Sequence, residues 1–453
     1  MSIDFNAFKE NLFAQAKQAG FSDCEIYYTN ESSLTVNVFE GEVSEYKSAG
    51  EAGLSFRGRL GDKMGYAYSE KLSDEVIPFL VENARQNAGI IEDEDIEEFY
   101  PGVGPYETPA LYNKALAAVT PAQKIEAALT LDKATRRADP RVESVDYCSV
   151  ITQTGQLFIA NTLGLNLTET ANALVSYAEA RAAENGQVKT GFGIHTGDSW
   201  SDFDPAAAGE KAAQKAVSLL GAKSVPTGKY RVVIKNEDMS ELLQAFWSVF
   251  SAEAAQKGFS LLKGKVGTKI ASEAVTLRDD ALRPGWLGSA GFDGEGVPTQ
   301  NKAVIENGVL KTFLHNLKTA RKDAAAPTGN GFRASFKSSV GVRPTNLYLA
   351  PGDGSYDGLL AEMGDGLVIA NFSGLHAGAN STSGDFSLIA SGWLVEKGVP
   401  VRPVEQITVA GNFFTLLQNV VSLSDDLFMG PPSGGVFGAP SVYAGELNVS
   451  GEG

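Results

Sequence analysis

Two carboxylates stand two residues apart in the segment 292–297, as Asp293 and Glu295. On an extended strand, residues i and i+2 share one face, so both side chains would point the same way. Such a pair could act in general acid–base catalysis or bind a hard cation. The neighbouring Gly294 and Gly296 suit a bulge or a close approach of two backbones instead. We therefore favour a structural role for the pair and keep catalysis as the alternative.

A second candidate site is a glycine-rich cluster between residues 364 and 386. Its most polar part contains Thr382, Ser383, Gly384 and Asp385. Small side chains there could let an extended peptide approach a strand edge. A set of hairpin turns has the same composition, and from the sequence alone we favour that interpretation.

The histidines and cysteines form no recognisable site. His195, His315 and His376 are separated by more than a helical turn, so no local pair of histidines can hold zinc. The sequence contains no HExxH, no CxxC, no P-loop and no strand-linked G-x-G-x-x-G. Two cysteines, Cys24 and Cys148, give no disulfide framework and fit a reducing compartment.

Composition narrows the classes of partner. The chain has 453 residues, 43% of them hydrophobic, and a formal net charge of -17. This charge argues against a nucleic-acid partner, because binding phosphates needs a positive patch. We read no signal peptide in residues 1–11 and no apolar run of about 18 residues that could span a membrane. We therefore expect a cytoplasmic protein.

These residues must be positioned by helices and strands, and the pattern of the sequence changes near 221–228. This boundary predicts an N-terminal domain over 1–224 and a C-terminal domain over 225–453. In the first, helical and strand patterns predict an α+β domain with an antiparallel sheet. The acidic run 92–98 reads as a solvated loop. The expected helices cover 5–20, 73–87, a stretch from 121 and 204–220, and the expected strands cover 24–28, 34–39, 53–57, 64–68, 142–152, 156–161 and 165–180.

The second half of the chain is richer in glycine. A buried-type strand at 230–234 and a helix over 239–255 precede a long β region with many turns. We expect this domain to be mostly antiparallel and to close toward a barrel or sandwich. The fold class predicted for the whole chain is α+β.

Several segments, taken in order, resemble the TldD/PmbA family, formerly described as modulators of DNA gyrase and now as peptide-maturation proteases. The resemblance covers most of the chain. The matching stretches are 65–68, 161–164, 264–267, 292–297, 303–311, 319–322, 327–331, 343–346, 364–368, 382–386 and 407–412.

The resemblance also implies where a metal site would be. In the active member, TldD, two histidines of an HExxxH helix and a later cysteine bind zinc, and the glutamate polarises water. The matching helix here is 242–255, and its motif positions hold Leu243, Gln244 and Ser248. No cysteine follows Cys148. This is the pattern of PmbA, or TldE, which implies that the chain binds no zinc and that a TldD-like partner supplies it.

The residues of this helix agree with that implication. Apolar side chains dominate 242–250, which indicates a helix buried in a core or an interface. A helix of this kind is not typical of a metal cradle.

Three functions are therefore compared. The first is a pseudo-protease subunit that binds an extended peptide, as a heterodimer with a TldD-like metalloprotease or as a homodimer. The resemblance implies trimming of modified peptide precursors and degradation of unfolded antitoxin-like peptides. The second is a stand-alone hydrolase that uses Asp293, Glu295 or Asp385. The third is a non-enzymatic binding or scaffold protein, including the link to DNA gyrase. We favour the first, because the family match is broad and the loss of ligands is complete.

Overall fold

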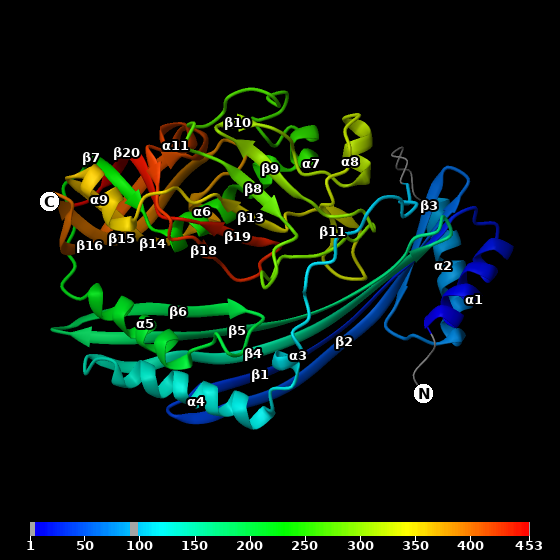
Figure 1. Ribbon diagram of the computed structural model, residues 1–453, viewed down its shortest axis with the longest axis horizontal. Coiled ribbons are helices and arrows are strands. Elements are labelled where there is room, and N and C mark those ends of the chain that lie inside the picture. Colours follow the sequence, from blue (N-terminus) through cyan, green and yellow to red (C-terminus); the bar gives the residue numbers. More distant parts are fainter. Residues whose placement is uncertain (1–4, 91–97, 453) are drawn as a thin grey trace.

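The computed structural model describes residues 5–90 and 98–452 of the chain. A long, twisted sheet with its helices forms one part, and the rest of the chain packs along it as a second part (Figure 1). The predicted α+β class is confirmed. Of the acidic run predicted as a loop, residues 92–97 lie outside the described ranges.

The N-terminal sheet has six antiparallel strands in the order β3-β2-β1-β4-β5-β6. Several strands are longer than predicted, because β1 and β4 pair with neighbours on both sides through their polar middles. Pairing on both sides satisfies the backbone and overrides local composition. The strands are β1 (Cys24–Phe39), β2 (Glu42–Leu60), β3 (Lys63–Ser69), β4 (Val142–Asn161), β5 (Asn166–Glu184) and β6 (Gln187–Gly197).

The strand β6 was not predicted. Its glycines made it look unlike a strand in the sequence, and in the fold they let α5 lie against it. Gly191 and Gly193 lie directly against the helix α5 (Pro205–Ser218). A Cβ at either position would come within 2.3 Å of the α5 backbone. Glycine lowers strand propensity, yet here only glycine lets the helix lie this close to the sheet.

Two pairs of helices cover this sheet. At one end α1 (Phe5–Gln18) and α2 (Ile77–Ile90), preceded by η1 (Asp74–Val76), bury a core that includes Phe8, Leu12 and Phe56. At the other end α4 (Pro121–Arg137) and α5 cover a second core, after the short α3 (Lys114–Ala117). Thr120 forms a capping box with Gln123 at the start of α4, and the Asp204 side chain caps α5, so both helices begin where the sequence predicted.

The C-terminal part contains a closed five-stranded barrel, which confirms the predicted closure. Its strands are β7 (Gly228–Ile234), β14 (Gly366–Ser373), β15 (Asp385–Glu396), β16 (Val399–Asn412) and β20 (Val442–Ser450). The pairing of β16 with β20 closes the barrel, and the pairing of β7 with β14 is its one parallel step. The two-residue strand β17 (Ser422–Leu423) adds to β20.

A second sheet and a hairpin lie beside the barrel, along the same side of the N-terminal sheet (Figure 1). The sheet runs β10 (Val309–Leu310), β9 (Asn301–Glu306), β8 (Leu277–Asp280), β13 (Asn346–Leu349), β19 (Val436–Ala439) and β18 (Phe428–Met429), and the hairpin is β11 (Gly331–Arg333) and β12 (Val340–Val342). The remaining helices are α6 (Asn236–Phe246), η2 (Trp247–Phe250), α7 (Ala252–Gln256), α8 (Leu317–Lys322), α9 (Tyr356–Met363), α10 (Leu375–Gly378) and α11 (Phe413–Asn419). No helix in the described ranges is long and apolar enough to cross a membrane.

Candidate functional site

The helix predicted over 239–255, with its motif positions in 242–255, is not continuous. It ends at Phe246, continues as the turn η2, and breaks at Ser251, whose φ of −78° and ψ of 127° are extended. The backbone around Ser251 bonds to Leu314 instead: Leu314 N donates to the Phe250 carbonyl at 2.9 Å, and Ala252 N donates to the Leu314 carbonyl at 3.0 Å. The Ser251 hydroxyl then caps α7. A strand-like contact with a distant segment therefore replaces the helical turn that the local pattern predicts.

The first motif position lies in the core. Leu243 is 1% exposed, and its neighbours Leu242 and Phe246 are fully buried. The Phe246 ring stacks on Phe413, with centroids 4.7 Å apart and planes 9° from parallel. The expectation of a buried apolar helix is confirmed for α6.

The other two motif positions, Gln244 and Ser248, are half-buried and offer only neutral oxygen and nitrogen atoms. Gln244 Nε2 donates to Ser433 Oγ at 2.9 Å. The carbonyl of Ser248 accepts from Ser251 N at 3.0 Å. Protein zinc sites use thiolate, imidazole and carboxylate ligands, so a Leu, a Gln and a Ser do not fit this ion. Over residues 5–90 and 98–452, no group of three or more His, Cys, Asp or Glu side chains is placed to hold a metal.

Ser433 was not singled out from the sequence, although it lies in a conspicuous loop, Gly-Pro-Pro-Ser-Gly-Gly at 430–435. Gly434 and Gly435 adopt positive φ values of 64° and 141°. This conformation lets the loop turn between β18 and β19 and bring Ser433 over α6. The run of turn residues at 430–435 could have predicted the loop. Only the fold shows that this loop contacts α6.

Charged residues at the start of α6 connect the two parts of the molecule. Glu237 accepts from Lys211, at 2.9 Å, and from Lys215, both on α5. Asp238 is 5% exposed, accepts from Phe372 N at 2.9 Å, and burial raises its pKa to about 7. These two carboxylates therefore hold the start of α6 against α5 and β14.

The pair Asp293 and Glu295 lies in a tight turn and not on a strand. Asp293 is fully buried. Its Oδ1 accepts from the backbone N–H groups of Glu295 at 2.9 Å and Val297 at 3.0 Å, and its Oδ2 accepts from Gly331 N at 2.8 Å. Burial raises the pKa of Asp293 to about 7, and the three N–H groups oppose this rise.

Glu295 is also buried, at 4% exposed, and it reaches a helix start. Its Oε2 accepts from Leu317 N, the first residue of α8, at 2.8 Å. Burial, followed by the charge of Asp293, raises its pKa to about 8. A Cβ at Gly331 would lie 2.3 Å from the same oxygen, and one at Gly294 would lie 3.0 Å from the Gly331 carbonyl. The close backbone approach that the flanking glycines indicated is therefore present.

A buried ionic junction lies between the N-terminal sheet and the hairpin β11–β12. Glu25 Oε1 accepts from Arg57 Nη2 at 2.8 Å and from Arg333 Nη2 at 2.5 Å. Arg333 also donates to Ser55 Oγ at 3.0 Å and lies 4.2 Å from the centre of the Tyr27 ring. No local pattern predicts this junction, because Glu25 and Arg333 are 308 positions apart in the chain.

The glycine-rich candidate forms a turn before β15. Asn380 Oδ1 accepts from Thr382 N at 3.0 Å and from Ser383 N at 3.2 Å. Gly384 has a φ of +84°, and a Cβ there would meet the Phe414 ring at 2.5 Å. Asp385 Oδ1 accepts from Asn412 Nδ2 at 2.9 Å, and this bond with one from Ser383 lowers the Asp385 pKa. The geometry is that of a strand turn whose polar groups face solvent.

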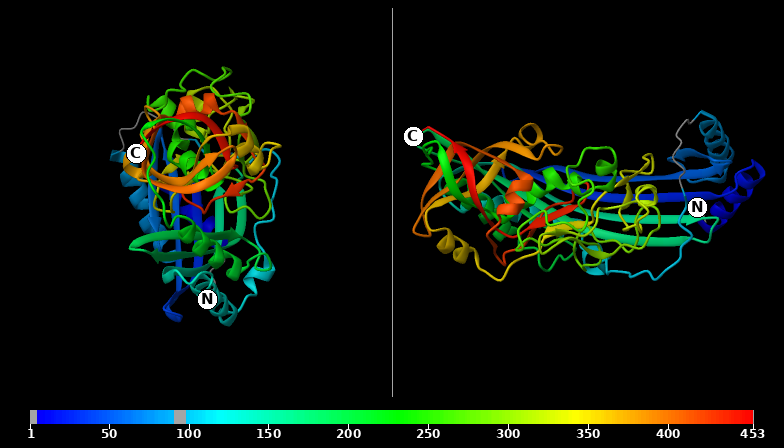
Figure 2. Two further views of the ribbon diagram at one scale, coloured as in Figure 1. Left: turned by 90° about the vertical axis from the view of Figure 1, so that its left-hand side faces the viewer. Right: turned by 90° about the horizontal axis from the view of Figure 1, so that it is seen from above.

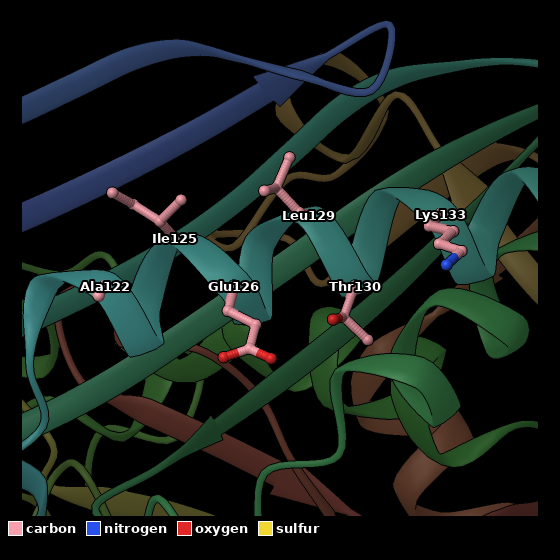
Figure 3. Close-up of a pocket in the computed structure, with 6 residues that line it drawn as sticks. All are labelled: Ala122, Ile125, Glu126, Leu129, Thr130 and Lys133. Carbon is pink, nitrogen blue, oxygen red and sulfur yellow. The ribbon is translucent and has the colours of Figure 1, made fainter.

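The remaining candidates are scattered. His195 lies on β6, His315 lies just before α8 and is 3% exposed, and His376 lies on α10. A shallow hollow runs along α4, where Ile125 and Leu129 point toward the β1–β2 hairpin (Figure 3). Its other lining residues are Ala122, Glu126, Thr130 and Lys133, which form no acid–base pair suited to catalysis.

Three family profiles match the chain in consecutive segments. The PmbA/TldA metallopeptidase domain 1 matches residues 24–88, the central domain matches 114–220, and the C-terminal domain matches 227–451. Curated relatives include a metalloprotease of Methanocaldococcus jannaschii, 26% identical over 90% of both chains. A PmbA homologue of Haemophilus influenzae is 27% identical over 91% of this chain and 89% of its own, and a TldD homologue of that organism is 25% identical over 92% and 88%.

Solved structures agree with these matches. A Thermotoga maritima protein described as a modulator of a DNA gyrase is 35% identical, with a TM-score of 0.91 over 98% of this chain and all of its own. TldE of Thermococcus kodakarensis has the same fold, with 23% identity and a TM-score of 0.90 over 98% of this chain and all of its own. The chain therefore belongs to the PmbA/TldD metallopeptidase family.

Proposed function

We propose that this chain is a PmbA/TldE-type subunit of a metalloprotease system that processes unfolded or modified peptides, and that it holds no catalytic zinc of its own. One observation carries the proposal: the first motif position is Leu243, which is 1% exposed in a closed hydrophobic core. A hydrocarbon side chain in this place cannot bind a metal, and its surroundings are already packed.

The relatives support the rest of the proposal. Their names include metalloproteases of both the PmbA and the TldD type, at similar identity to this chain. A chain that keeps the whole fold but has lost the zinc ligands suits binding and assembly better than catalysis. In this account a TldD-like partner supplies the zinc and the catalytic glutamate, and both subunits act in the cytoplasm.

The contribution of this chain would then be to hold the peptide. Thr382, Ser383 and Asp385 lie in an exposed or half-exposed turn at the start of a barrel strand. Small side chains at a strand end leave room for an extended peptide to add its backbone. These residues are the ones we would change first to weaken peptide binding.

A stand-alone hydrolase that uses Asp293 and Glu295 is not favoured. Both oxygens of Asp293 accept backbone N–H groups, and neither carboxylate has appreciable solvent exposure. A general base must reach a substrate proton directly or through one water. The raised pKa values of the pair are explained by burial in a turn.

Cleavage of an unfolded peptide tests the proposal. The purified chain, a TldD-like subunit and their mixture are compared at equal zinc concentration. We expect cleavage by the mixture and none by this chain alone. The matched control is a mixture in which the partner's motif glutamate is replaced by glutamine, and we expect that mixture to be inactive. Cleavage by this chain alone would contradict the absence of a site, and equal cleavage by the partner alone would contradict the subunit role.

A further inference from the structure

A loop that follows α7 and lies along β10 has the opposite charge to the rest of the chain. Residues 257–269, which we call the lysine loop, contain no aspartate or glutamate, whereas the whole chain has a formal net charge of -17. The loop has four lysines, Lys257, Lys263, Lys265 and Lys269. A local reversal of sign of this kind indicates a surface that attracts a negatively charged partner.

Two of these lysines are left for such a partner. The first and the last lysine of the loop each pair with a glutamate four positions away, at N–O distances of 2.6 and 2.7 Å. Over residues 5–90 and 98–452, no carboxylate forms an ion pair with Lys263 or Lys265. Lys263 Nζ donates only to a neutral group, the Gln256 carbonyl, at 3.5 Å. The positive charge at the centre of the loop is therefore not neutralised.

The same loop exposes three large apolar side chains. Phe259 is 57% exposed, Leu261 is 54% exposed and Val266 is 51% exposed. The alternate residues point inward, because Ser260 and Leu262 are buried. The loop thus presents a phenylalanine and a leucine outward, next to the two unpaired lysines. Apolar side chains beside lysines are typical of segments that bind at a membrane–water interface.

The fold holds these side chains in place. Ser260 Oγ donates to the Val249 carbonyl at 2.6 Å and accepts from Leu262 N at 3.2 Å. Further along the loop, Gly267 N donates to the Leu310 carbonyl at 2.8 Å. Because the loop is bonded to the rest of the C-terminal part at two places, binding needs little further ordering of its backbone.

The lysine loop lies on the outer side of the C-terminal part. Figure 1 draws it in green, projecting at the top beside β10, with the N-terminal sheet on the opposite side. The left view of Figure 2 shows the same arrangement, with the green loop at the upper margin and the N-terminal sheet at the lower one. Neither the hollow along α4 nor the hollow beside α9 includes a residue of the loop. The loop therefore offers a raised surface.

We infer that the lysine loop binds the surface of a membrane that contains anionic lipids, with Phe259 and Leu261 inserted at the headgroups and Lys263 and Lys265 against their negative charges. An anionic lipid surface offers both a negative charge and an apolar layer, and the loop presents the complement of both. A soluble polyanion offers the charge alone. The contact is peripheral and not a membrane span, and it is independent of the proposed function because it involves neither zinc nor peptide.

The acidic remainder of the chain opposes this contact, and distance limits its effect. The net charge of -17 is spread over the whole molecule, whereas the lysine loop would touch the lipid. Near 0.15 M salt the Debye length is about 8 Å, so remote acidic residues are screened and lysines at the headgroups are not. Binding is therefore measured at this ionic strength.

Flotation of the full chain with lipid vesicles tests the role of the charges. One set of vesicles contains phosphatidylcholine and phosphatidylserine in equal parts, and the other contains phosphatidylcholine alone. We expect the chain to float with the first set only. K263E/K265E should lower the partition to anionic vesicles about tenfold or more, because two attractive charges become repulsive. The matched control K71E/K114E changes the net charge equally at two exposed lysines of the N-terminal part, and it should leave the partition nearly unchanged.

The same assay tests the apolar side chains. F259A/L261A should lower the partition to anionic vesicles about tenfold or more, because two apolar groups can no longer leave water. The matched control is F79A/L163A, since Phe79 is 56% exposed and Leu163 is 45% exposed on the N-terminal part. We expect this control to float like the unchanged chain.

A fluorescent label tests which surface enters the lipid. An environment-sensitive dye on Leu261→Cys should shift its emission to the blue when anionic vesicles are added, and the same dye on Leu163→Cys should not. The native Cys24 and Cys148 are buried, and burial raises both thiol pKa values to about 12, so they react little with the dye.

The possible outcomes separate the partners of the loop. A chain that floats with neither set of vesicles at millimolar lipid would overturn the inference. So would flotation that survives both double substitutions in the loop, because another surface would then meet the lipid. Binding of an acidic peptide or an oligonucleotide in place of vesicles would assign the loop to a soluble polyanion. Sedimentation in which F259A/L261A alone separates associated chains would assign it to a subunit contact, and either result would also overturn the inference.

Discussion

Two buried regions of this chain are opposite in chemistry. Around α6, where relatives of the TldD type are expected to hold zinc, Leu242, Leu243 and Phe246 form a closed hydrocarbon core. At the junction of the two parts, Glu25, Arg57 and Arg333 form an ionic cluster of similar burial. The three motif positions carry no zinc-type ligand, and the region rich in charge joins the two parts of the molecule.

The difference shows how a buried carboxylate should be interpreted. Raised pKa values often indicate catalytic groups, because active sites shift them. Here the raised pKa of Asp293 accompanies three backbone N–H donors and no solvent exposure. The accessibility of the oxygens, and not the size of the shift, separates a structural carboxylate from a catalytic one.

The largest expected effect comes from removing the shared carboxylate of the junction. Glu25→Ala leaves the Arg57 and Arg333 guanidinium groups, both under 10% exposed, without this partner. We expect the free energy of unfolding to fall by about 3–5 kcal/mol, because removing one partner of a buried ion pair is costly. Urea denaturation followed by tryptophan fluorescence and circular dichroism measures it. Glu25→Gln, which keeps the shape, should cost less, and a loss below about 1 kcal/mol for alanine would contradict the assigned role.

The next effect comes from restoring the family's motif across α6 and η2. The triple variant Leu243→His, Gln244→Glu and Ser248→His supplies zinc-type ligands but places an imidazole in the core. We expect a loss of about 2–4 kcal/mol, from lost apolar burial and a buried polar group. We also expect no stoichiometric zinc, because a third ligand is missing. Metal analysis and thermal unfolding with and without zinc check this, and one zinc per chain with a raised Tm would contradict it.

A smaller effect is expected in the carboxylate turn. Asp293→Asn places an amide N–H₂ group where the backbone of Gly331, or that of Glu295 and Val297, donates. We expect a loss of about 1–3 kcal/mol, the cost of an unsatisfied buried donor. Asp353→Asn is the matched control, because Asp353 is exposed, and it should change stability little. Equal effects of the two substitutions would show that the turn does not depend on these bonds.

The smallest effect is expected for Glu295→Gln, and it appears in the pH dependence. The pKa of Glu295 is raised from an ordinary 4.5 to about 8, so the folded state binds its proton more tightly than the unfolded chain does. Its contribution to stability is therefore full below about pH 4.5 and is lost as the pH rises through about 8. Glu295→Gln should change stability by less than about 1 kcal/mol at neutral pH and flatten this slope. An unchanged slope in denaturation curves from pH 5 to 8.5 would contradict the assignment.

The sequence predicts those features that depend on local patterns. The helix starts near 121 and 204 and the closure of the second half into a barrel follow from turn residues and periodicity. The break at Ser251 and the strand β6 do not, because contacts with Leu314 and with α5 decide them. For the candidate site, the residue types at 243, 244 and 248 are read directly from the sequence. The contact of Gln244 with Ser433 and the complete burial of Asp293 are visible only in the folded structure.

Zinc stoichiometry of the native chain tests the central claim most directly. The purified protein is saturated with zinc, dialysed against a weak chelator and analysed for bound metal, with a TldD-like subunit treated in parallel. The account predicts less than about one tenth of a zinc per chain here and about one in the TldD-like subunit, since structural and catalytic zinc sites bind tightly. The account would be contradicted if this protein retained one zinc per chain and lost it when a side chain of its own that binds the metal was substituted.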